Sequence, residues 1–84
     1  MNFFVTATMI TTDGAEAHRA EETRTLNELR GEGVVSAAYL RTDGQGLIGI
    51  VHGTDLSDVQ AQLARLPFVV HGLMAFEYAE IVPL

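Results

Sequence analysis

The turn sequence Asp43-Gly44 lies between two runs of strand-forming residues, 34–42 and 45–52. An Asp-Gly pair flanked by apolar runs is a strong hairpin signal, because a type I′ turn requires positive φ at both of its central residues. We therefore expect two adjacent antiparallel strands in the middle of the chain. Only the segments on either side of this hairpin remain to supply helices and further strands.

The segment before the hairpin predicts one strand followed by one helix. Residues 3–10 are rich in aromatic and β-branched types, which is typical of a strand. Asp13, with Glu16 three residues later, is a candidate N-cap pair for a helix that runs to about Arg30. Glycines follow this helix directly, as they do at many helix C-termini.

The segment after the hairpin predicts a helix followed by a strand. A cap at Thr54 or Asp55 begins the helix, its apolar residues recur at helical spacing, and Pro67 ends it. Residues 73–82 form the last strand. The order βαββαβ predicts an α+β fold of the ferredoxin-like type, a four-stranded antiparallel sheet with two helices on one face, as a single domain over residues 1–84.

The predicted strands are apolar on both faces, which bears on self-association. Two helices cover only one face of such a sheet. If the other face met water, apolar and polar residues would alternate along each strand. The 84-residue chain is 48% hydrophobic and 19% charged, and it has no cysteine for disulfides. A chain of this size buries only about 60–65% of its unfolded surface, so we expect a homodimer or larger homo-oligomer with sheet packed against sheet. The alternative is a monomer with one exposed apolar face.

The charge of the chain argues against several classes of partner. Eleven acidic residues face five arginines and no lysine, for a formal net charge of -6. Nucleic acids and anionic membranes are therefore not expected as partners, and the missing lysine excludes Schiff-base and P-loop chemistry. No run reaches the roughly 18 apolar residues of a membrane span, and the N-terminal residues lack the basic region of a signal peptide. We expect a cytoplasmic protein without a cofactor.

Glu22 is the residue that the first predicted helix marks for chemistry. At 100° per residue, Ala15, Leu26 and Leu29 lie within about 40° of it, so Glu22 falls in the middle of the apolar stripe. Burial would raise the pKa of its carboxyl toward the range in which it shuttles protons at neutral pH. The alternatives are that Glu22 bends to solvent or pairs with Arg19 or Arg41.

Histidines and tyrosines supply the other candidates. His18 precedes Glu22 by one helical turn and would be its neighbour. Because the sequence has no H-E-x-x-H motif and no cysteine, we expect no metal site. His18 would then orient the carboxylate or meet solvent. His52 and His71 lie in or beside predicted loops, and Tyr39 lies in a predicted strand. Each of these three has either a packing role or a role in binding a ligand.

Several short motifs, in order, resemble the muconolactone delta-isomerase family of the dimeric α+β barrel superfamily. Ala20-Glu21-Glu22 leading to Glu32-Gly33 is similar to the family's A-D-E stretch followed by R-E-G. Leu66-Pro67-Phe68 resembles its L-P-L-F, and residues 80–84 resemble its terminal E-V-x-x-L. The pattern runs without a gap from Ala20 to Phe68.

The resemblance implies a role for Glu22. Members of the family are proposed to move a proton across an allylic lactone, in aromatic catabolism, with a glutamate that corresponds to Glu22. The tyrosine and asparagine that accompany this glutamate correspond here to Gln45 and Leu47. The family's tryptophans correspond to Val35 and Tyr39, and about five extra residues follow Pro67.

Two functional hypotheses follow for the whole chain. In the first, it is a cofactor-independent isomerase or lyase acting on a lactone, enone or similar small molecule, with Glu22 as the proton shuttle. His18 or Arg19 would hold the charge state of Glu22, and substrate oxygens would be bound by other side chains, namely Tyr39, Gln45, His52 or His71. In the second, it is a non-catalytic homo-oligomeric module that binds a small ligand or stabilises a partner enzyme.

Overall fold

The computed structural model describes all 84 residues and contains four strands and three helices. In chain order the elements are β1 (Asn2–Met9), α1 (Ala15–Gly31), β2 (Val35–Leu40), β3 (Gly46–His52), α2 (Leu56–Leu63), α3 (Pro67–Val70) and β4 (Met74–Ile81). The predicted order βαββαβ is confirmed, with α3 as an additional short helix.

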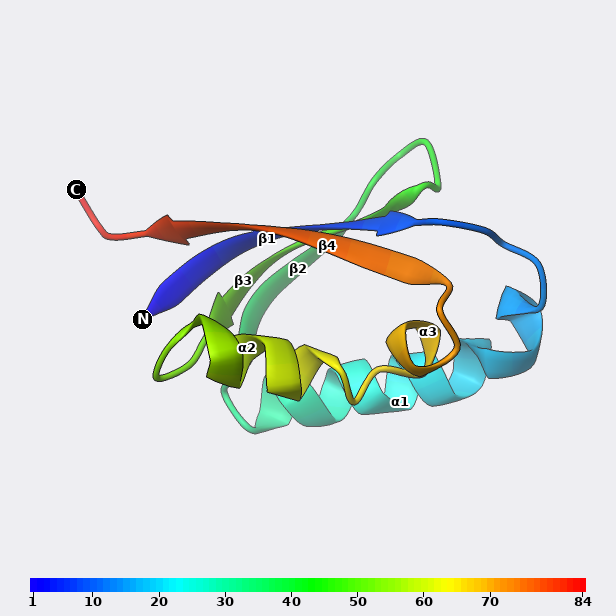
Figure 1. Ribbon diagram of the computed structural model, residues 1–84, viewed down its shortest axis with the longest axis horizontal. Coiled ribbons are helices and arrows are strands. Elements are labelled where there is room, and N and C mark those ends of the chain that lie inside the picture. The colour runs from blue at the N-terminus through cyan, green and yellow to red at the C-terminus, as the bar shows by residue number, and fades with distance from the viewer.

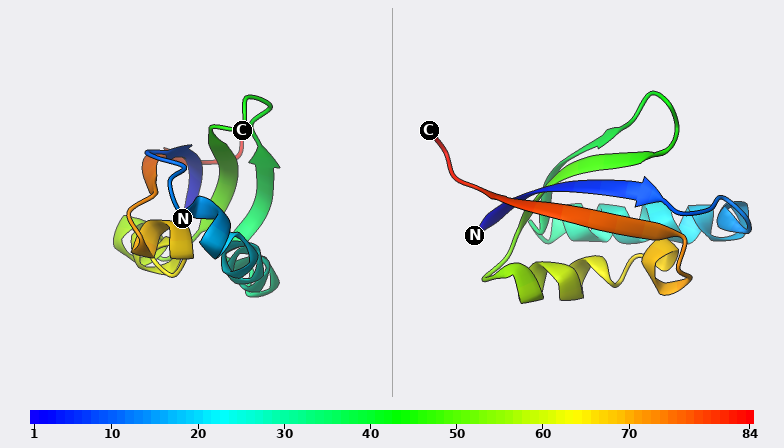
Figure 2. Two further views of the ribbon diagram at one scale, coloured as in Figure 1. Left: turned by 90° about the vertical axis from the view of Figure 1, so that its right-hand side faces the viewer. Right: turned by 45° about the horizontal axis from the view of Figure 1, so that its top comes forward.

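The four strands form one antiparallel sheet in the order β2-β3-β1-β4. Figure 1 shows all three helices beneath the same face of this sheet, and the turned views in Figure 2 agree. Because β1 lies inside the sheet between β3 and β4, the first and last strands of the chain are hydrogen-bonded neighbours. The predicted ferredoxin-like plait is confirmed.

Alternation along β1 separates the two faces of the sheet. Phe3, Val5 and Ala7 are buried against the helices, whereas Phe4 and Thr8 on the opposite face are exposed. On the helix side, Leu29 of α1 and Val59 of α2 are fully buried and join the same core as Phe3 and Val5. This core lies between the sheet and the helices.

The two long helices begin in different ways. The N-cap of α1 is Gly14, with φ of 79° and no side-chain hydrogen bond, so the expected cap pair of Asp13 and Glu16 is wrong. Asp13 instead takes part in the preceding turn, where its N–H donates to Thr11 Oγ1 at 3.1 Å. The second helix does have a side-chain cap, because Asp55 accepts a hydrogen bond from the N–H of Asp58 at 2.8 Å.

The hairpin between β2 and β3 is confirmed, but its turn is not of type I′. Gly44 has φ of 72°, and no residue other than glycine has positive φ, so Asp43 does not adopt the required conformation. The turn is instead closed by the N–H of Gly44 on the carbonyl of Arg41 at 3.0 Å. Asp43 stabilises it by accepting from the N–H of Gln45 at 2.9 Å.

Pro67 begins a helix where the sequence predicts that one ends. The second helix stops at Leu63, and Pro67 occupies the first turn of α3, where its missing N–H costs nothing. Gly72, with φ of 69°, follows α3 and leads the chain into β4. The short helix α3 packs against α1, and this contact positions the site described below.

The face of the sheet that the helices leave uncovered carries large apolar side chains. Phe4 lies directly opposite Ile50 in the β1–β3 ladder, and Phe4 is 40% exposed. Tyr39, on β2, is 67% exposed, and Ile81, at the end of β4, lies on the same face. We call this surface, defined by Phe4, Tyr39, Ile50 and Ile81, the outer face. No helix in the fold has the length and apolar composition needed to cross a membrane.

Candidate active site

Glu22 lies in the middle of α1 and is buried, with 7% of its surface exposed. The other buried residues of this helix are Ala15 and Leu29, one on each side along the same stripe. The prediction that Glu22 faces the sheet is therefore confirmed. A carboxylate in this position is costly unless a partner or a cavity compensates for its lost hydration.

One oxygen of Glu22 has a partner, and the other has none. Oε1 accepts a hydrogen bond from the backbone N–H of Phe68 at 2.8 Å, whereas Oε2 is buried without any hydrogen bond. Phe68 lies in the first turn of α3, where backbone N–H groups have no acceptor within the helix. Glu22 thus holds α3 against α1 with one oxygen and leaves the other free.

No ion pair neutralises Glu22. Arg19 donates from Nε to Glu16 at 2.8 Å, and Arg41 pairs with Asp43 at 2.6 Å. The alternative of a salt bridge from Glu22 to Arg19 or Arg41 is therefore wrong, as is the alternative that it bends to solvent. Burial raises the pKa of Glu22, and the N–H of Phe68 opposes this rise only in part.

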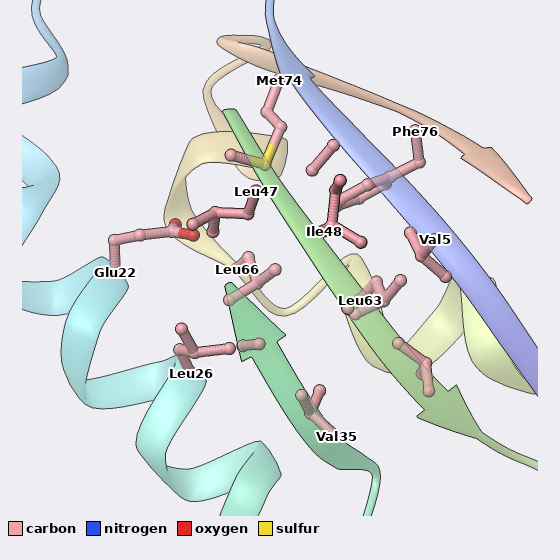
Figure 3. Close-up of a pocket in the computed structure, with 14 residues that line it drawn as sticks. Val5, Glu22, Leu26, Val35, Leu47, Ile48, Leu63, Leu66, Met74 and Phe76 are labelled. Atoms are coloured by element: carbon pink, nitrogen blue, oxygen red, sulfur yellow. The ribbon is translucent and has the colours of Figure 1, made fainter. Parts of the chain in front are cut away.

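The carboxyl of Glu22 borders a small inner cavity between the sheet and the helices, drawn in Figure 3. This inner cavity has a volume of about 40 Å³, and Glu22 is the one ionisable residue among the 14 that line it. Figure 3 shows the carboxyl pointing from α1 toward Leu47. The remaining walls are almost entirely apolar, including Val5, Leu26, Leu63, Leu66, Met74 and Phe76.

Glu22 also borders a second, larger cavity that opens to solvent near the hairpin. This open cavity has a volume of about 220 Å³ and shares Glu22, Leu26, Leu47 and Met74 with the inner one. Its other walls include Met9, Thr12, Arg19, Thr23, Leu40 and Phe68. Glu22 therefore lies where an almost entirely apolar cavity meets a larger cavity with a more polar lining, which is a suitable position for a group that exchanges protons with a bound molecule.

Of the other predicted site residues, Arg19 alone lines a cavity with Glu22. His18 does not reach it, and its ring stacks on that of His71 with centroids 3.8 Å apart and an interplanar angle of 13°. His71 directly follows α3, so the end of this helix lies beside His18. His18 and His71 line neither cavity, and their expected roles in orienting the carboxylate and binding substrate stay predictions.

The remaining candidates also lie away from both cavities. Tyr39 is exposed on the outer face, and Gln45 is exposed in the hairpin. His52 is hydrogen-bonded across the outer face to Asn2 Oδ1 at 2.6 Å and to Ser36 Oγ at 2.7 Å. Tyr39, Gln45 and His52 line neither cavity, and their expected role in binding substrate oxygens stays a prediction. No three His, Asp or Glu side chains are grouped so as to hold a metal ion.

Sequence reasoning missed two contributors to the site. The sequence does not reveal the N–H of Phe68 as a donor, because this group belongs to α3 and Pro67 predicts a helix end there. Thr23, which lines the open cavity, follows Glu22 directly and lies toward the edge of the apolar stripe. The position of Thr23 on the helical wheel does not predict a cavity, because the same cavity is also lined by Leu40, Gly44 and Gly46, which come from another part of the chain.

Known structures share the fold that surrounds these cavities. No protein-family model matches the chain, and no curated protein matches it by sequence. Muconolactone isomerase matches it with a TM-score of 0.80 and 17% identity, over 100% of this chain and 91% of that one. A second match is a 5-chloro-2-hydroxyhydroquinone dehydrochlorinase (TftG) from Burkholderia phenoliruptrix AC1100, in complex with 2,5-dihydroxybenzoquinone. Its TM-score is 0.73 and its sequence identity is 15%, over 98% of this chain and 94% of that one. The chain thus has the ferredoxin-like fold found in muconolactone isomerase.

Proposed function

We propose that this chain is a cofactor-independent isomerase or lyase that moves a proton on a lactone or enone-type small molecule, with Glu22 as the shuttle. The observation that carries the proposal is the buried, unbonded Oε2 of Glu22 at the junction of the two cavities. A structural carboxylate would be expected to have both oxygens satisfied.

The chemistry follows from the two different environments of the carboxylate oxygens. Phe68 fixes Oε1, and Oε2 has no hydrogen-bond partner in the protein, so Oε2 is the oxygen that we assign to proton transfer. As the carboxylate, Glu22 removes a proton from a carbon next to the unsaturated carbonyl, which leaves a dienolate. The same carboxyl, now protonated, returns the proton to another carbon on the same face. A raised pKa brings the carboxyl closer to the pKa range in which both steps are accessible at neutral pH.

The structural neighbours support this class of reaction. One is named as an isomerase, and the other is a dehydrochlorinase bound to a quinone, which is a small oxygenated ring compound. The resemblance of residues 20–68 to the muconolactone delta-isomerase family supports the choice of Glu22, because it implies that the family's glutamate corresponds to this residue.

The test compares Glu22→Gln with Glu21→Gln on a compact β,γ-unsaturated lactone in D₂O, followed by ¹H NMR. E22Q keeps the size and an acceptor for Phe68 but cannot carry a proton, so both isomerisation and deuterium incorporation should fall by about 10²- to 10⁴-fold. Glu21 is exposed and pairs with Arg24, so E21Q should behave as wild type. Activity in E22Q within a few-fold of wild type would refute the proposal. Destabilised E22Q with no wild-type activity to lose would favour the non-catalytic module instead.

We also propose that the protein self-associates through its outer face. Phe4, Ile50 and Tyr39 present apolar surface there, and a second sheet packed against it would bury this surface at roughly 25 cal/mol per Å². Polar residues such as Thr6 and Glu77 share this face, and large exposed apolar side chains grouped among polar ones are typical of interfaces. A homodimer or larger homo-oligomer therefore suits the protein better than a monomer.

A further inference from the structure

The open cavity carries one positive group, Arg19, next to the proposed proton shuttle. Arg19 and Glu22 are the two charged residues in its lining. The other paired arginines, Arg24, Arg41 and Arg65, are held by acidic neighbours and line neither cavity. In a chain with a formal net charge of -6, a cation at the mouth of a cavity is a local exception to the field of the whole protein.

The guanidinium of Arg19 makes one hydrogen bond to the protein and has further N–H donors without a partner. Its Nε donates to Glu16 Oε2 at 2.8 Å, and its terminal nitrogens, Nη1 and Nη2, make no hydrogen bond to the protein. An arginine side chain has five N–H donors in a planar fork that fits a carboxylate with two parallel bonds. Glu16 is 85% exposed, so this surface pair fixes the side chain weakly and leaves the fork available.

The spacing of Arg19 and Glu22 limits the size of a molecule that touches both. They are three residues apart on α1, which places their Cβ atoms roughly 5–6 Å apart on one side of the helix. The open cavity of about 220 Å³ is smaller than the roughly 300–1,000 Å³ typical of drug-sized ligands. Its lining also includes the apolar residues Leu26, Phe68 and Met74.

We infer that the molecule bound in the open cavity is a compact monocyclic anion, whose carboxylate or enolate oxygen is bound by Arg19 while its ring lies in the apolar part beside Glu22. The inference deepens the proposed function, because it assumes that this cavity receives the substrate. Arg19 is then a specificity-determining residue that selects charged over neutral molecules of the same shape. It also counters the repulsion between an anionic ligand and the Glu22 carboxylate.

The experiment measures the binding of two probes of matched shape, benzoate and benzamide, by ¹H–¹⁵N NMR titration at low ionic strength. Wild type should bind benzoate roughly tenfold more tightly than benzamide, the factor expected of a charge-assisted bond worth about 1.4 kcal/mol. Arg19→Gln should remove this preference by weakening benzoate and leaving benzamide unchanged. Arg24→Gln should keep it, because Arg24 makes the same i,i+3 pair on the same helix without lining a cavity.

Other results would overturn the inference. Equal affinity for the two probes in wild type, binding of neither, or a preference that survives R19Q would each contradict it, provided that resonances of the open cavity are observed. The outcome is separable from that of the proposed function, because E22Q should retain the preference for benzoate. An E22Q variant with full catalytic activity and an intact Arg19-dependent preference would refute the proton shuttle and leave the anion site standing.

Discussion

At the scale of single residues, the proposed chemistry depends on Glu22, and the burial of its carboxyl costs stability. Burial removes water from the carboxyl, and one backbone N–H replaces only part of the lost hydration. The unbonded Oε2 is therefore expected to destabilise the folded state while keeping the carboxyl reactive. Such a conflict between stability and reactivity is common at catalytic positions.

This conflict predicts a pH-dependent stability difference between wild type and Glu22→Gln. Because burial raises the pKa of Glu22 from about 4.5, the folded protein binds a proton there more tightly than the unfolded chain does. The contribution of Glu22 to the free energy of unfolding therefore falls as pH rises from about 4.5 to the raised pKa, and it stays low above that. Urea unfolding should show E22Q to be more stable than wild type at pH 8.

The same comparison at lower pH provides the control. The advantage of E22Q should shrink as the pH falls below the raised pKa, because the carboxyl of the folded wild type is then increasingly protonated. Glu21→Gln should show no pH-dependent difference of this kind, because Glu21 is exposed. An E22Q variant that is less stable than wild type at pH 8 would contradict the cost assigned to the buried carboxylate.

The sequence was informative about Glu22 because helical periodicity is a local property. The position of a carboxylate within an apolar stripe depends only on its neighbours along α1, and the structure confirms it. The partner of His18 could not be predicted in the same way. It stacks on His71, which is distant in sequence and reaches His18 only through the packing of α3 against α1.

At the scale of elements, helix caps and close backbone contacts set the geometry around the site. Asp55 caps α2 through its bond to the N–H of Asp58. Asp55→Ala should lower the free energy of unfolding by about 1 kcal/mol, the usual effect of losing an N-cap side chain. Asp55→Asn retains an acceptor and should cost much less. Equal losses for the two variants in urea unfolding would show that the cap bond is not responsible.

Gly46 is the element-scale position least tolerant of a side chain. A Cβ there would lie 1.9 Å from the carbonyl oxygen of Ala7 on the adjacent strand, so β1 and β3 would have to separate. Gly46→Ala should lower the free energy of unfolding by about 1–3 kcal/mol, as overpacking typically does. Gly31→Ala meets no atom within 4 Å and serves as the control, with no loss expected. A stable G46A variant would contradict the close contact.

The elements were predictable to the extent that their signals are local. The hairpin followed from Asp43-Gly44 and its flanking apolar runs, but the turn type did not, because the longer loop needs positive φ only at Gly44. The helix α3 was missed because proline disfavours the helical conformation in the residue before it and also favours the first turn of a new helix. The four residues of α3 are too few for a hydrophobic period to show whether Pro67 ends one helix or begins another.

At the scale of the whole molecule, the apolar outer face predicts self-association. Sedimentation velocity should show wild type as a dimer or larger species at micromolar concentration. Ile50→Glu places a charge in the middle of the outer face and should yield monomers. Gln60→Glu on the exposed surface of α2 makes the same change of charge away from this face and should leave the size unchanged. A wild-type protein that stays monomeric would refute the proposed interface.

The most direct test of the central claim, that α1 holds a reactive carboxyl at the junction of the two cavities, is the titration of Glu22 itself. The ¹³Cδ shift of Glu22 can be followed by NMR in ¹³C-labelled protein, with E22Q used to assign the resonance. The pKa of Glu22 should lie above the ordinary value of about 4.5, because burial outweighs the single bond from Phe68. A pKa at or below 4.5 would show that the carboxylate is fully solvated or paired, which would contradict both the site and the chemistry proposed for it.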